Sequence, residues 1–139
     1  MTIHHQLIND CHQLGRMNSG TLLLHKNASV PWFILVPDTD KTELLYLPAN
    51  QRDQIMQDCS SIAVFIKQQF GSEKINFAAI GNLVPQLHLH VIGRNKNDPC
   101  WPKPVWGHLH ADDSYREETI QRITESLFGA VKADISRDR

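Results

Sequence analysis

The chain has 139 residues, of which 41% are hydrophobic and 21% are charged, and its net charge is −1 with histidines counted as neutral. This length and composition are typical of one globular domain, so we expect a single domain over residues 1–139. The nearly balanced charge argues against a nucleic-acid or membrane-binding surface, because either would need clustered Lys and Arg.

The cysteine pattern points to a reducing compartment. Cys11, Cys59 and Cys100 are odd in number and lie far apart, with no C-x-x-C pair, so a disulfide framework is not expected. The first twenty residues do not read as a signal peptide, and the longest strongly apolar run, Trp32–Val36, is too short to cross a bilayer. We therefore expect a cytoplasmic protein.

The first third of the chain predicts one helix and two strands. Apolar residues recur at helical spacing over Thr2–Leu14, and Gly15 would end that helix. The short apolar runs Gly20–Leu24 and Trp32–Val36 are separated by a polar segment, which predicts two strands joined by a turn.

The middle of the chain predicts a long helix followed by two strands. Asn50 is an expected N-cap, an apolar stripe continues to Phe70, and Gly71 is the expected C-terminal stop. The segments Ile75–Ala79 and Leu87–Ile92 have the composition of strands.

The remainder predicts an irregular segment and a last helix. Residues 98–107 hold three prolines and two tryptophans and cannot form regular structure. Ser114 and Glu117 have capping-box spacing before a helix. Its apolar face would carry Ile120, Ile123, Leu127 and Val131. With short links dominating, we expect an α+β fold with a mainly antiparallel sheet.

The segment that carries chemistry is Gln86-Leu-His88-Leu-His90-Val-Ile92. Successive side chains of a strand point to opposite faces, so Gln86, His88 and His90 would share one face at a spacing of about 7 Å. The opposite, core-directed face would carry Leu87, Leu89 and Val91. One strand would thus present an amide and two imidazoles in a row.

Three interpretations of this row are open. It can be a solvated sheet face, although strict alternation of Gln and two histidines makes that less natural. It can be a metal site, with a third ligand from His108, His110 or Cys100, because zinc needs at least three protein ligands. It can also hold a nucleophile, because a neutral imidazole nitrogen is able to attack phosphorus at physiological pH.

This segment resembles the signature of the histidine-triad (HIT) family, His-x-His-x-His followed by apolar residues, with Gln86 in the first place. Lys74–Asn82 looks like the family's strand and phosphate loop, Pro31–Pro37 like its earlier core strand, and Trp101-Pro102 like a Trp-Pro of its nucleoside-phosphoramidate branch. The resemblance covers roughly residues 21–107 and is strongest to bacterial diadenosine tetraphosphate hydrolase-like members.

The resemblance implies a meander sheet with a long helix packed on it and helical N- and C-terminal segments. It also implies a homodimer, no required cofactor or metal, and a covalent nucleotidyl-histidine intermediate. Its nucleophile falls on His88, its phosphate-contacting histidine on His90 and its polar loop residue near Asn82. Its ribose contact falls on His25 or Asn27.

Two tryptophans are additional candidates for the nucleotide site. Trp101 and Trp106 would either stack on the base or pack the proline-rich segment onto the sheet, and aromatic side chains serve both purposes equally well.

The chain departs from the family pattern in two places. Gln86 replaces a histidine, and an amide can donate a hydrogen bond to phosphate but cannot protonate a leaving group. The loop Gly81–Pro85 is short and lacks the family's Gly-Gln before the triad. We therefore expect slow turnover or a restriction to good leaving groups.

Three functions follow as hypotheses. The first is a nucleotidyl hydrolase or transferase acting on a purine-nucleotide conjugate, with His88, His90 and Gln86 as catalytic residues. The second is a nucleotide-binding sensor with little or no turnover because of Gln86. The third is a metal protein. A covalent nucleotide on His88 would separate the first two, and metal analysis would decide the third.

Overall fold

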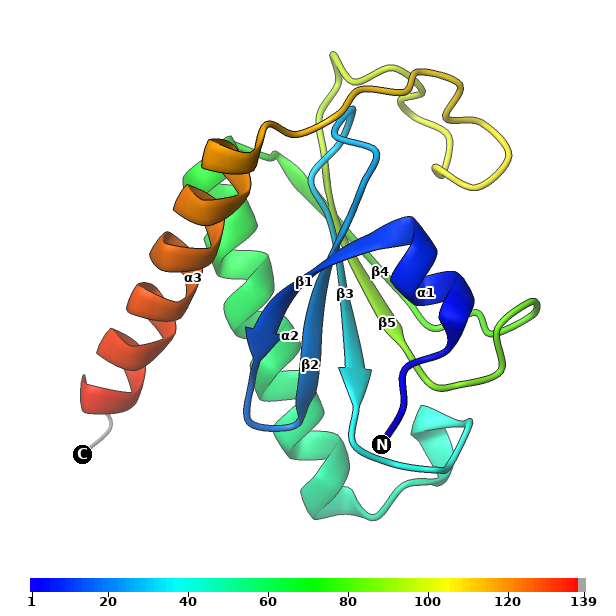
Figure 1. The fold of residues 1–139 in the computed structure, drawn as a ribbon, viewed down its shortest axis with the longest axis vertical. Helices are drawn as coiled ribbons and strands as arrows, with labels where there is room; N and C mark the ends of the chain where they lie inside the picture. The colour runs from blue at the N-terminus through cyan, green and yellow to red at the C-terminus, as the bar shows by residue number, and fades with distance from the viewer. Residues whose placement is uncertain (138–139) are drawn as a thin grey trace.

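The sheet is antiparallel and has five strands in the order β1-β2-β3-β5-β4. A computed structural model describes residues 1–137 of the chain (Figure 1). The strands are β1 (Cys11–Arg16), β2 (Gly20–His25), β3 (Trp32–Pro37), β4 (Lys74–Ala78) and β5 (Leu89–Arg94). The predicted α+β fold with an antiparallel sheet is therefore confirmed.

The two long helices cover one face of this sheet. They are α2 (Ala49–Phe70) and α3 (Glu117–Arg137), and Figure 1 shows α2 behind the strands and α3 to its left, next to α2 and β1. The short helix α1 (His5–Asp10) lies on the opposite face, and a single 3-10 turn, η1 (Leu44–Tyr46), precedes α2. Among the described residues, no helix combines the length and hydropathy that a membrane span requires.

Alternation along β3 divides the core between the two faces. Phe33 and Leu35 pack against the helical layer, whereas Trp32, Ile34 and Val36 pack toward α1 and the loop after β5. Every residue of β3 is consequently buried. A strand covered on both faces reads as a continuous apolar run, which is what the sequence shows.

The predicted helix over Thr2–Leu14 is wrong in its second half. The helix ends at Asp10, and β1 pairs with β2 from Cys11 onward. Cys11 packs in the core on the α1 side, and Leu14 packs in the core under the long helices. Residues three apart on a strand point to opposite faces, so burial on both faces produced a spacing that imitates a helical stripe.

The C-terminal end of α2 is as predicted, but its beginning is not. Gly71 adopts the left-handed conformation, with φ of 67°, and its N–H donates to the carbonyl of Lys67. The helix starts one residue before the expected N-cap Asn50, with Pro48 in the capping position and no side-chain cap. Tertiary contacts of the apolar stripe therefore hold this end without a cap.

The predicted capping box before α3 does not form. Glu117 is the first helical residue, whereas a capping box with Ser114 would need it at the third position. Ile120, Ile123 and Leu127 are buried against the other elements, as expected. The side chain of Val131 lies outside the described residues.

Candidate active site

A groove of about 870 Å³ runs across the α1 face of the sheet. It lies between α1, the start of β3, the loop 80–84 and Trp106, and it contains both His88 and His90. Its volume is in the range of pockets that bind small molecules. The two histidines of the motif are thus on the face and in the kind of cavity that a nucleotide site requires.

The two histidines share this face although the strand begins later than predicted. β5 begins at Leu89, so the predicted strand Leu87–Ile92 is displaced by two residues, and residues 86–88 approach it as a loop. Leu87, Leu89 and Val91 still pack in the helical core, as expected. β4, which pairs with β5, is displaced by one residue from its prediction.

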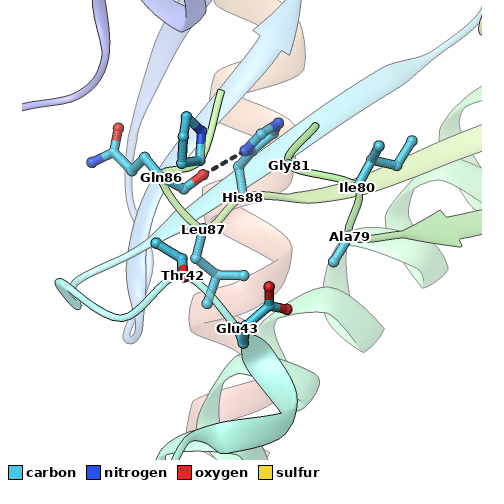
Figure 2. A pocket seen from close by; sticks show the side chains of 9 residues that line it. Thr42, Glu43, Ala79, Ile80, Gly81, Gln86, Leu87 and His88 are labelled. Atoms are coloured by element: carbon cyan, nitrogen blue, oxygen red, sulfur yellow. Dashed lines mark hydrogen bonds between the residues drawn. The ribbon is translucent and has the colours of Figure 1, made fainter. Parts of the chain in front are cut away.

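His88 is oriented by its own neighbour in the sequence. Its Nδ1 lies 2.7 Å from the main-chain carbonyl oxygen of Gln86 (Figure 2). A carbonyl oxygen can only accept, so Nδ1 carries the proton and Nε2 keeps its lone pair in the neutral ring. The side chain is 7% exposed, which restricts it to a narrow range of orientations.

His90 has the opposite arrangement of its two ring nitrogens. The indole Nε1–H of Trp32 donates to His90 Nδ1 at 3.0 Å. Because indole is only a donor, Nδ1 must be unprotonated, and the proton of the neutral ring is on Nε2. His88 therefore offers a lone pair and His90 offers a hydrogen-bond donor.

We expect the His90 ring to stay neutral from about pH 8 down to about pH 4. Burial, with the nearby His88 and His25 rings, lowers the pKa of His90 to about 3. Histidine ring nitrogen shifts measured by NMR over this range would check it. In Trp32→Phe, which removes the indole donor, we expect a mixture of His90 tautomers.

A titration of His90 near the pKa of a free imidazole would contradict this arrangement. The lowered pKa also has a consequence for stability. The unfolded chain takes up the His90 proton first, so the contribution of this ring to folding is complete above about pH 6.5 and falls as the pH drops toward the folded pKa.

The rings of His25, Trp32 and Trp106 form an aromatic part of the groove lining. His25 stacks on Trp32 with centroids 4.1 Å apart and planes at 11°, and Trp106 meets both Trp32 and His90 edge-on. Burial lowers the pKa of His25, although the negative charges of Asp10 and Asp112 oppose the shift. This part of the groove is therefore an aromatic surface suited to a planar base, with the carboxylate of Asp10 also in the lining.

Gln86 does not point into the groove beside His88. Its side-chain Oε1 accepts from the main-chain N–H of His4 at 2.7 Å, and its Nε2 donates to the carbonyl of Thr2 at 3.0 Å. Figure 2 shows the amide directed away from the His88 ring, on the other side of the main chain. Of the three side chains predicted to form a row, only the imidazoles of His88 and His90 line the groove. The amide of Gln86 instead forms hydrogen bonds with residues 2 and 4.

The structure separates the remaining candidates into two groups. Asn82, His25 and Trp106 line the groove with the histidines. Asn27 does not, because its side chain holds residues 111–113 by hydrogen bonds. Trp101 does not either, and lies instead against the guanidinium of Arg94, 5.7 Å from the ring centroid.

The structure does not bring the candidate third metal ligands, His108, His110 and Cys100, into the groove with His88 and His90. His108 and His110 are exposed in the segment after Trp106, and neither lines the groove. Cys100 is buried beside Arg94, which donates to its sulfur. Within the described part of the chain, no three His, Cys, Asp or Glu side chains lie in a group that could share a metal ion.

Sequence reasoning gave no site role to Trp32 or His4, which both line the groove. Trp32 begins the predicted core strand Trp32–Val36, and alternation from Phe33 and Leu35 places its side chain on the histidine face, so the sequence contains a signal for it. His4 lies just before α1 and belongs to no motif of the sequence. Its approach to the groove depends on Gln86, 82 positions away, and no local pattern reveals that.

Solved structures of similar proteins share this fold over nearly the whole chain. A histidine triad protein from Marinobacter aquaeolei VT8 is 36% identical, with a TM-score of 0.86 and coverage of 95% of this chain and 96% of that one. Histidine triad proteins from Bradyrhizobium japonicum and Sinorhizobium meliloti 1021 are 33% and 32% identical, with TM-scores of 0.85 and 0.86 and the same coverage of 93% and 96%. No curated protein matches.

The family profile of the HIT domain matches residues 6–97, which include both histidines and all five strands. Together with the groove and its two oriented imidazoles, this shows that the chain belongs to the histidine-triad family.

Proposed function

We propose that the protein is a nucleotidyl hydrolase or transferase that cleaves the α-phosphate bond of a purine-nucleotide conjugate, as expected of a diadenosine tetraphosphate hydrolase-like member. HIT-domain proteins are generally nucleotide hydrolases or transferases. The observation that carries the proposal is the 2.7 Å contact between His88 Nδ1 and the Gln86 carbonyl. It makes Nε2, the free atom of a buried ring in the groove, a nucleophile.

The reaction would proceed in two displacements. The lone pair of His88 Nε2 forms a bond to the α-phosphorus while the bond to the leaving group breaks, and the leaving atom departs with that electron pair. The positive charge that develops on the His88 ring is stabilised by the Gln86 carbonyl at Nδ1. Water then attacks phosphorus, releases its proton to solvent and returns the pair to Nε2.

His90 would stabilise the charge on the transferring phosphoryl group. Its Nε2–H, fixed by the Trp32 contact at the other nitrogen, is a donor for a non-bridging oxygen. Asn82, exposed in the loop beside the groove, would supply a second donor. His25 and Trp106 would hold the base and ribose. Gln86 does not take part in these phosphate contacts.

The test is to trap the covalent intermediate. The protein is mixed with a dinucleoside tetraphosphate, an adenosine phosphoramidate and an adenylated lysine, quenched within one turnover and analysed by mass spectrometry of the peptide containing His88. We expect one nucleotide monophosphate on this peptide with at least one substrate. Binding of adenine nucleotides without adduct or turnover would favour the alternative, a nucleotide sensor, because Gln86 brings no proton donor to the site.

We also propose that the protein is a homodimer. β4 is the last strand of the sheet, and an open edge strand is a site for strand pairing. Phe77 on this strand is 42% exposed. We expect Phe77→Lys to shift the protein toward a monomer in light scattering, whereas Leu45→Lys, at a more exposed site on η1, leaves the mass unchanged. A monomeric parent protein would contradict the proposal.

We place this activity in the cytoplasm. The three cysteines are all unpaired and buried, which fits a reducing compartment.

A further inference from the structure

Gln86 joins the catalytic loop to the beginning of the chain. Its main-chain carbonyl contacts His88, and its side chain makes both of its hydrogen bonds to residues 2–4. Both contacts to the segment are with main-chain atoms, so they fix its path whatever side chains it carries. The residue that replaces the first histidine of the triad is thus occupied in holding this segment beside the nucleophile.

The segment brings His4 into the groove. His4 lines the same cavity as His88 and His90. Its Nδ1 accepts the main-chain N–H of Gln6 at 3.0 Å, so the proton of the neutral ring is on Nε2. His4 therefore offers the groove a hydrogen-bond donor on a third imidazole, and this ring comes from outside the motif.

The groove does not end at His4. A second cavity of about 530 Å³ lies beyond it, between residues 1–5, the turn 39–41 and Gln86. His4 lines both cavities. The cavity that contains the aromatic rings and the two motif histidines and the second cavity therefore meet at His4.

We propose that the second cavity, with His4 at its entrance, receives the leaving group of the substrate, and that this leaving group is a phosphate chain. The inference rests on the proposed nucleotidyl transfer and names its substrate class, a nucleoside polyphosphate. Gln86 is a positioning residue that acts through His4.

The donors favour a phosphate chain over an amine. An amine must take up a proton as its bond to phosphorus breaks, whereas a phosphate departs as a stable oxyanion that needs only hydrogen bonds or cations. His88 Nδ1–H is engaged by a carbonyl, His90 Nδ1 accepts from Trp32, and His4 Nδ1 accepts from Gln6. A ring nitrogen that accepts a hydrogen bond is unprotonated, so the contacts of His90 and His4 leave each of these two rings with Nε2–H as a hydrogen-bond donor, whereas His88 is the attacking residue.

The second cavity contains a cation for the chain of phosphates. The cation is Lys41, which lines this cavity. The negatively charged Asp40, next to it in the sequence, lines the cavity as well. Thr39 accepts the main-chain N–H of Lys41 and so organises this turn. A phosphate chain leaving His88 would pass the Nε2–H of His4 and reach the ammonium group of Lys41.

The experiment compares two substrates that share AMP and differ beyond the scissile bond. One is diadenosine tetraphosphate, and the other is the p-nitrophenyl ester of AMP, which has a good leaving group without phosphates. We expect the ratio of their kcat/KM values, polyphosphate over ester, to fall about tenfold in His4→Asn and in Gln86→Ala, as for the loss of one hydrogen bond to a charged group. Asn retains the capping role of His4, so the local structure persists.

His108→Ala is the matched control, because this histidine is exposed and lines neither cavity. Its ratio should remain within about twofold of the parent protein, well below the effect of a hydrogen bond to a charged group. An unchanged ratio in His4→Asn, or parent turnover of an adenosine phosphoramidate as fast as of the polyphosphate, would overturn the inference.

Failure of the proposed function would give a different result. If the parent protein turned over neither substrate, binding would be measured instead. Its affinities for AMP and for a non-hydrolysable methylene analogue of the polyphosphate would then test whether the second cavity binds a phosphate chain. Tighter binding of the analogue, lost in His4→Asn, would support the second cavity as a phosphate-chain site in a binding protein. Equal affinity for the two ligands in the parent protein would overturn it.

Discussion

We expect His88→Ala to lower kcat/KM by about 10³-fold or more for every substrate that the parent protein cleaves, because it removes the atom that we propose attacks phosphorus. No other imidazole is placed to substitute. His90 presents Nε2–H rather than a lone pair, since Trp32 donates to its Nδ1. Steady-state kinetics on the substrate panel would measure the loss, and the trapped adduct should disappear with it.

The variant must be shown to be folded for this loss to have meaning. Because His88 is buried, the circular dichroism spectrum and melting curve of the variant are compared with those of the parent protein. AMP binding by the variant then shows whether the groove is intact. His108→Ala provides the parallel histidine deletion at an exposed position. Substantial turnover by a folded His88→Ala protein would refute the nucleophilic role.

Asp98→Ala lowers the free energy of unfolding by about 3 kcal/mol or more, since it leaves a buried guanidinium without its counter-charge. The side chains of Arg94 and Asp98 are 1% and 8% exposed, and Arg94 Nε donates to Asp98 at 2.7 Å. Asp98 also accepts the main-chain N–H groups of Asn95, Cys100 and Trp101. Urea unfolding of the two proteins would measure the difference.

An exposed ion pair in the same chain is the control. Arg16 and Asp38 are paired, but their side chains are 57% and 44% exposed, so Asp38→Ala should cost less than about 1 kcal/mol. Equal losses of unfolding free energy in Asp98→Ala and Asp38→Ala would show that burial does not determine how much an ion pair stabilises this protein. The loop that Asp98 holds leads to Trp106, so Asp98→Ala should also weaken nucleotide binding.

The acid dependence of stability should follow the same pair. Burial raises the pKa of Asp98, but the hydrogen bonds from Arg94 and from main-chain N–H groups outweigh it, and the pKa is lowered. A lowered carboxylate pKa contributes stability above the unfolded value, about 3.9, and this contribution is lost as the pH falls through the folded value.

Local patterns predicted the elements whose environment is local. The stripe that ends at Phe70, the left-handed Gly71 and the buried runs of β2 and β3 were all found in the structure. Each depends on periodicity or on a backbone angle that one residue type favours. The spacing of Cys11 and Leu14 led to a wrong helix prediction because two separate cores bury opposite faces of β1. Apolar residues three positions apart then fit either one face of a helix or the two faces of a buried strand.

The sequence by itself determined the chemistry available at the site, because alternation from Leu89 to Val91 places His88 and His90 together on one face. Tertiary structure decided what each residue does there. The tautomers of the two rings are set by a main-chain carbonyl and by Trp32, 58 positions from His90. The direction of Gln86 is set by residues 2 and 4. These partners are distant in the chain, and hydrogen bonds between distant residues leave no periodic trace in a sequence.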